Sequence, residues 1–183
     1  YINSSVSTQS STLTTVQTQS VLFCFLCKDK YKSYHPIPSV NHGIRQNKMN
    51  IIEQLTEQQI IQLHELYSHE WWSNSRTLEQ TKCCVAGSQI IIGITEISGK
   101  LIGFTRVLTD YTFKALMFDV IIHQDHRKEN LGSKLINLVK AHPELKNVVH
   151  FELYCLPELF EFYKTHGFNN DVGGMRLMRY TNA

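Results

Sequence analysis

Residues 127–133, Arg-Lys-Glu-Asn-Leu-Gly-Ser, place two basic side chains, a glycine and a hydroxyl at the predicted start of a helix. The first N–H groups of a helix lack internal partners, and the helix dipole adds partial positive charge there, so phosphate groups bind well at such an end. Gly132 allows close approach of the backbone, and Ser133 can donate a further hydrogen bond. The sequence has neither the GxxxxGK[ST] nor the GxGxxG pattern. Two interpretations therefore stay open at this point: an ordinary loop, or an anion-binding turn.

Histidine and cysteine pairs elsewhere do not predict a metal site. His64 and His69 are five positions apart, so on a helix they diverge and cannot bind one ion as residues four apart do. Cys24 and Cys27 have the spacing of half a zinc site, but the chain offers no second spaced pair. We expect no metal cofactor.

Composition narrows the class of protein. Five cysteines without regular spacing argue against a disulfide framework and for a reducing compartment, so we expect a cytoplasmic protein. The longest apolar run, residues 21–27, is too short to span a membrane. Residues 49–183 carry 13 Lys or Arg against 15 Asp or Glu, and no basic stripe with interleaved aromatic residues, so we expect no nucleic-acid partner.

The chain divides at Met49. Eleven of the first twenty residues are Ser or Thr and none is charged, a composition that buries too little apolar surface to order itself. We predict that residues 1–48 are disordered or an upstream extension. Residues 49–183 form one predicted domain.

Periodicity predicts the elements of this domain. Thr56 with Gln59, and Thr77 with Gln80, have capping-box spacing and predict two helix starts. Further helices are expected over residues 131–142 and 157–167, the latter ending at Gly167. Strands are expected over residues 50–55, 89–97, 101–108, 115–122, 148–155 and 175–180. This order predicts an α/β fold with a mixed, mostly antiparallel central sheet and helices on both faces.

Two blocks of the sequence resemble the GNAT family of N-acetyltransferases. Arg127 to Gly132 is similar to the family's loop pattern Arg/Gln-x-x-Gly-x-Gly/Ala, and residues 162–168, FYKTHGF, resemble a later block with a tyrosine four residues before Gly-Phe. The blocks have the family's order and spacing, and the resemblance covers about residues 50–180. Asn130 stands in place of the first glycine, and asparagine tolerates positive φ better than most residues. Leu156 stands where many members have asparagine.

The resemblance implies acetyl-CoA as co-substrate. Its pyrophosphate would be bound by Arg127, Lys128, Glu129, Asn130, Leu131, Gly132 and Ser133. Backbone groups of Val120, Ile121 and Ile122 would pair with the pantetheine arm. Tyr163 would donate a proton to the departing thiolate, since a phenol is protonated at neutral pH.

The resemblance also implies an amine acceptor, a small molecule or a protein. Asp119 is the first candidate for the base that deprotonates it, although a salt bridge is an equally open role for this carboxylate. Glu70, His123 or a base acting through water are further candidates. Trp71, Trp72 and Arg76 are expected to border the acceptor, with one tryptophan packed and one exposed.

The implied activity is direct transfer of acetyl to a primary amine in a ternary complex. The alternative is a non-catalytic module of the same fold that binds coenzyme A or a protein. A homodimer formed through strand edges is a further expectation.

Overall fold

In the computed structural model, which describes residues 49–182, five strands form one sheet in the order β1-β2-β3-β4-β5. The expectations for residues 1–48, including Cys24 and Cys27, lie outside the described residues. The first four strands pair antiparallel, and β5 pairs parallel to β4. The strands are β1 (Met49–Ile52), β2 (Ile90–Glu96), β3 (Leu101–Thr109), β4 (Lys114–Ile122) and β5 (His150–Leu153). The prediction of a mixed, mostly antiparallel sheet is confirmed.

The first two helices each begin after a threonine whose side chain caps them. Thr56 caps α1 (Glu57–Ser68) and Thr77 caps α2 (Leu78–Ala86), each in the complete capping box that the sequence predicts. Helix α3 (Leu131–Lys140) follows β4, and the short α4 (Phe160–Lys164) follows β5 after a 3-10 turn (Pro157–Leu159). Among residues 49–182, none of the helices combines the length and the apolar character that a membrane span requires.

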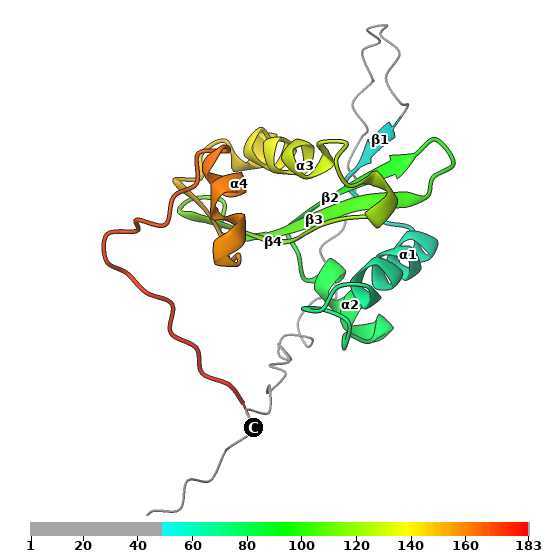
Figure 1. The fold of residues 1–183 in the computed structure, drawn as a ribbon, viewed down its shortest axis with the longest axis horizontal. Coiled ribbons are helices and arrows are strands. Elements are labelled where there is room, and N and C mark those ends of the chain that lie inside the picture. Colours follow the sequence, from blue (N-terminus) through cyan, green and yellow to red (C-terminus); the bar gives the residue numbers. More distant parts are fainter. Residues whose placement is uncertain (1–48, 183) are drawn as a thin grey trace, which may run out of the picture.

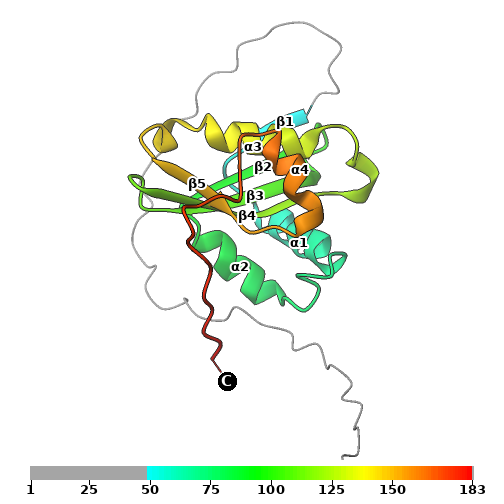
Figure 2. The same ribbon diagram turned by 60° about the vertical axis from the view of Figure 1, so that its left-hand side comes forward.

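Helices cover both faces of the sheet, as Figures 1 and 2 show. On one face Leu135, Ile136 and Val139 of α3 share a buried cluster with three isoleucines of β2, Ile90, Ile92 and Ile94. On the other face Leu63, Leu66 and Tyr67 of α1 pack against β3 and β4. The apolar stripe of each helix thus meets one face of the sheet. Strand β4 contributes to both clusters, with Met117 on the α3 side and Ile121 on the α1 side.

The pairing of β4 with β3 is interrupted by a bulge in β4, after which the two strands pair again. Arg106 pairs with Phe118 and Phe104 with Ile121, so Asp119 and Val120 together stand opposite the single residue between them on β3. Such a bulge bends a strand. Pairing with β5 covers only residues 114–117 of β4, so on the side opposite β3 the backbone of residues 119–122 has no strand partner within the described sheet.

The prediction of a strand over residues 175–180 is wrong. This segment has no strand partner in the structure, and Leu177 and Met178 are exposed. Its alternation of apolar and basic residues is typical of a strand, but a strand also needs an edge to pair with and a face to bury. The predicted helix over residues 157–167 is shorter than expected and ends before Gly167, whose φ of 86° reverses the chain.

Candidate active site

The turn between β4 and α3 borders a cleft of about 430 Å³. Most of the predicted anion-binding residues lie in its wall, which is formed by Ile122, His126, Arg127, Lys128, Asn130, Leu131, Gly132, Ser133 and Phe162. Glu129 is the exception in the predicted set: its carboxylate instead lies 3.3 Å from a ring nitrogen of His126. The cleft therefore combines two basic side chains with the start of a helix.

The start of α3 is open to an external anion. Asn130 precedes the helix in the left-handed conformation, with φ at 61°, and its side chain does not cap the helix. The positive φ expected of this asparagine is confirmed, and Lys128 also has positive φ, at 80°. Because no side chain caps this end, its first N–H groups remain as donors at the cleft wall. Both the donors and the dipole favour a phosphate here.

Arg127 stands between this cleft and a smaller cavity. Its Nε donates to the carbonyl oxygen of Ile122 at 3.2 Å, and a terminal nitrogen pairs with the Glu70 carboxylate at the end of α1. The smaller cavity, of about 70 Å³, is lined by Leu66, His69, Glu70, Ile122, His123, Gln124 and Arg127. Ile122 and Arg127 thus form a wall common to both spaces.

The start of α3 is tied to the turn after α4. The Ser133 hydroxyl lies 3.0 Å from Nε2 of His166, and Lys140 Nζ donates to the His166 carbonyl at 2.6 Å. Phe162 of α4 forms part of the cleft wall. These contacts fix α4 against α3 at the cleft.

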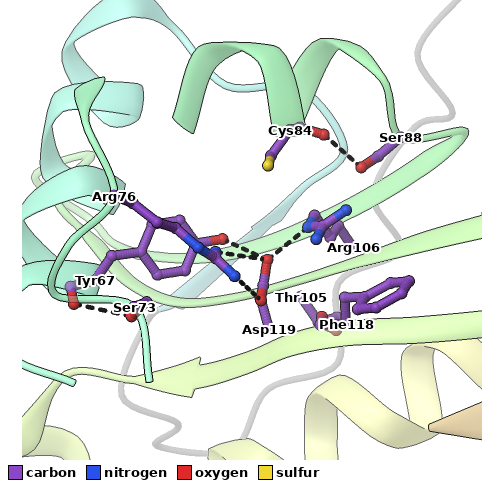
Figure 3. A network of polar contacts seen from close by, with 9 residues as sticks. All are labelled: Tyr67, Ser73, Arg76, Cys84, Ser88, Thr105, Arg106, Phe118 and Asp119. Atoms are coloured by element: carbon purple, nitrogen blue, oxygen red, sulfur yellow. Dashed lines mark hydrogen bonds and ion pairs between the residues drawn. The ribbon is translucent and has the colours of Figure 1, made fainter. Parts of the chain in front are cut away.

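Asp119 lies in a buried cluster of charges beneath α2 (Figure 3). Its carboxylate accepts a hydrogen bond from Arg106 at 2.5 Å, two from Arg76 at 3.1 Å each, and one from the Tyr67 hydroxyl at 2.9 Å. Burial alone would raise the pKa of this carboxyl, but the two guanidinium groups outweigh burial and hold it below its usual value. Burial and the Asp119 charge raise the pKa of Tyr67.

The sequence left two roles open for Asp119, a catalytic base and a salt-bridge partner, and the structure shows the salt bridges. Its backbone has φ at 55° within the bulge of β4, and its oxygens accept four hydrogen bonds from three side chains. A buried carboxylate with a lowered pKa that is paired with two guanidinium groups is a poor base. The structure places Asp119 as the residue that fixes the bend in the strand.

Tyr163 lies on α4 against the core on the α3 side of the sheet. Its ring is in edge contact with Phe162 and Phe168, at centroid distances of 5.1 and 6.0 Å. Burial, with a smaller contribution from Cys155, raises the pKa of Tyr163 to about 12. The phenol therefore holds its proton throughout the physiological range. Phe162, its neighbour, is the α4 residue in the cleft wall.

The segment between α1 and α2 carries the residues expected at an acceptor. Trp71 is 68% exposed, while Trp72 packs edge-on against Tyr67 at 5.9 Å. Arg76 lies over the rings of Tyr67 and Trp72, at 4.5 and 5.3 Å from their centroids, and pairs with Asp119. Trp72 is nevertheless 38% exposed, so both tryptophans reach the surface and the expectation that one of them is packed is met only by the edge contact with Tyr67. The arginine is committed to the charge cluster.

Several of these residues were not predicted from the sequence. Arg106 and Tyr67 complete the Asp119 cluster, and His126 and Phe162 complete the cleft. A signal existed for Arg106, since a charge inside the apolar run 101–108 needs a buried partner, and Asp119 interrupts the next strand. The aromatic wall had no such signal. Within residues 49–182, no three His, Cys, Asp or Glu side chains gather as metal ligands would.

Comparison with known proteins agrees with this architecture. The acetyltransferase (GNAT) domain profile matches residues 81–170. The chain is 30% identical over 122 residues to the uncharacterized N-acetyltransferase ycf52 of Pyropia yezoensis, a match that covers 65% of this chain and 70% of that protein.

Solved structures share the fold. A protein from Xanthomonas campestris pv. campestris described as belonging to the GNAT family superposes with a TM-score of 0.65 at 24% identity, over 73% of this chain and 94% of that one. Glucosamine-6-phosphate N-acetyltransferase from Arabidopsis thaliana gives a TM-score of 0.59 at 19% identity, over 74% of this chain and 99% of that one. At these identities the likeness extends to the fold alone.

Proposed function

This chain belongs to the GNAT family of acetyltransferases, and from that membership we propose that it transfers acetyl from acetyl-CoA directly to a primary amine. One observation carries the proposal: a cleft with two basic side chains opens at the uncapped start of α3, beside the β4 edge that β5 leaves unpaired. Bound there, acetyl-CoA supplies an activated acetyl thioester.

In this proposal residues 127–133 bind the diphosphate of the co-substrate. Arg127 and Lys128 contribute charge, and the N–H groups of Leu131, Gly132 and Ser133 contribute hydrogen bonds. The backbone of Val120, Ile121 and Ile122 offers N–H and C=O groups to the extended arm, because β4 has left β5 at that point. Donors fixed on a strand can also polarise a carbonyl, as in an oxyanion hole.

Tyr163 acts in the proposal as a hydrogen-bond donor to the leaving sulfur. Its pKa of about 12 lies above that of a free thiol, about 8.5, so the phenol keeps its proton and stabilises the thiolate by a hydrogen bond rather than by complete transfer. Because the pKa of Asp119 is lowered, the base that receives the amine proton is sought elsewhere. Glu70 and His123 line the smaller cavity and are the candidates, directly or through water.

The acceptor is proposed as an amine on a small molecule or a protein, bordered by Trp71, Trp72 and the loop that carries them. One protein that shares the fold is named as an N-acetyltransferase of glucosamine 6-phosphate, which supports the proposal of a small-molecule acceptor. We further propose a reducing compartment, with the cytoplasm and a homodimer remaining predictions from the sequence.

The test is release of free thiol from acetyl-CoA in the presence of a panel of amines, with coenzyme A binding measured separately by calorimetry. Thiol release that depends on an amine, with the acetylated amine identified by mass spectrometry, supports the transferase. Binding of coenzyme A without release for any amine would favour the non-catalytic module. Two departures from the family pattern motivate that alternative: Asn130 in place of glycine and Leu156 in place of asparagine.

A further inference from the structure

The segment between α1 and α2, residues 69–77, is held at both ends by arginine–carboxylate pairs. At its start Glu70 pairs with Arg127 of the turn before α3. Near its end Arg76 pairs through two hydrogen bonds with Asp119 in the bulge of β4. We call residues 69–77 the clasped loop. Its two partners belong to the two elements that form the proposed co-substrate site.

The two pairs differ in burial. Arg76 and Asp119 are 20% and 4% exposed in their side chains, and the pair is shared with Arg106 and Tyr67, so this end is fixed. Arg127 is 53% exposed and lies in the wall of both cavities. The Glu70 end is therefore the one that an incoming anion can reach.

Arg127 has donors to spare for a second anion. A guanidinium carries five N–H groups in a fixed plane. The Ile122 carbonyl takes the Nε proton and Glu70 takes a terminal one, which leaves three. A phosphate held by these donors shares its arginine with Glu70, so any shift of the guanidinium is felt by that carboxylate. Glu70 is followed directly by Trp71.

We propose that Glu70 is a positioning residue that couples occupancy of the phosphate site, through Arg127, to the position of Trp71 and Trp72 at the acceptor side. This inference rests on the proposed function, because it takes the phosphates of coenzyme A as the anion at Arg127. Arg76 holds one end of the clasped loop in place, while Glu70 at the other end moves with the Arg127 guanidinium. Binding of the co-substrate thereby changes the position of the two tryptophans.

The chain provides its own reporter. Trp71 and Trp72 are its only tryptophans, and both lie in the clasped loop, so all tryptophan emission comes from this segment. We expect coenzyme A to change the emission of the wild-type protein saturably, with the dissociation constant that calorimetry gives. In Glu70→Gln, saturating coenzyme A should still produce binding heat, while the emission change is lost. Arg127→Gln also removes a proposed phosphate contact, so it should weaken coenzyme A binding as well as abolish the emission change. The double variant should behave like Arg127→Gln, since one contact carries the emission change.

Glu65→Gln is the matched control. It removes the same charge five residues earlier, from the exposed face of α1, and should keep the full emission response. Trp71→Phe and Trp72→Phe then assign the signal to one ring. An unchanged response in Glu70→Gln at calorimetric saturation, or no response in the wild type at saturation, overturns the inference alone. Absence of coenzyme A binding by the wild type overturns the proposed function and the inference with it.

Discussion

At the scale of single residues, two guanidinium groups surround one carboxylate. Arg76 and Arg106 both bond to Asp119, whose side chain is 4% exposed, so the charges are removed from water together. Breaking such a buried pair is costly because the remaining charge loses its partner. The left-handed backbone of Asp119 also costs about 1 kcal/mol for a residue that is not glycine. The cluster stabilises this conformation and with it the bend in β4.

Asp119→Asn keeps the shape of the side chain and removes its charge. We expect the free energy of unfolding to fall by about 3 kcal/mol in urea titrations at neutral pH, since two arginines lose their counter-ion. Glu161→Gln is the control, because its carboxylate forms only an exposed pair with Lys164. Equal effects of the two substitutions would contradict a structural role for the cluster.

The same pair of proteins gives a pH dependence. The pKa of Asp119 is lower in the folded state than its ordinary value, so its contribution is complete above about pH 4 and is lost as the pH falls below that. The stability difference between wild type and Asp119→Asn should therefore shrink on acidification. A difference that instead grew below about pH 4 would mean that the folded-state pKa is raised.

Tyr163→Phe tests the phenol. We expect kcat to fall about a hundredfold with little change in the KM for acetyl-CoA, because the hydroxyl acts on the leaving sulfur and not on binding. With a pKa of about 12, the tyrosine should not limit the wild-type rate up to about pH 10. An unchanged kcat would remove Tyr163 from the mechanism.

At the scale of elements, the sequence predicted the features that depend on residues a few positions apart, such as helix caps. The capping residues Thr56 and Thr77, and the positive φ of Asn130, depend on neighbours within a few positions and are confirmed. The bulge at Asp119 and the unpaired segment 175–180 depend on which strand lies alongside, and periodicity within a segment does not contain that information. The partner of Arg127 is equally non-local, since Glu70 is fifty-seven positions away.

Thr77→Ala removes the side chain that caps α2 directly after the clasped loop. The hydroxyl accepts from the Gln80 N–H at 3.2 Å, and its loss should lower the free energy of unfolding by about 1 kcal/mol. Thr77→Ser is the control and should stay close to wild type in the same urea titration, because serine caps equally well. A full loss in the serine variant would show that the methyl group, not the cap, stabilises this end.

At the scale of the whole molecule, the two helical layers converge on one strand. Helix α1 covers one face of the sheet, and α3, which follows β4 in the chain, covers the other face (Figures 1 and 2). The bend at Asp119 opens the edge between them, and Arg127 joins the two layers through Glu70. The fold class and the position of the turn before α3 followed from the sequence, whereas the contact between the two layers could be found only in the packed sheet.

The central claim is that the start of α3 binds the diphosphate of coenzyme A, and calorimetric titration of Gly132 variants tests it most directly. A Cβ at Gly132 would meet only Phe162, at 3.6 Å, an ordinary contact, so the backbone accepts a side chain. We predict that Gly132→Ala retains coenzyme A binding, while Gly132→Glu abolishes it by placing a carboxylate where the phosphates bind. Undiminished affinity in Gly132→Glu would contradict the account and place the phosphates elsewhere.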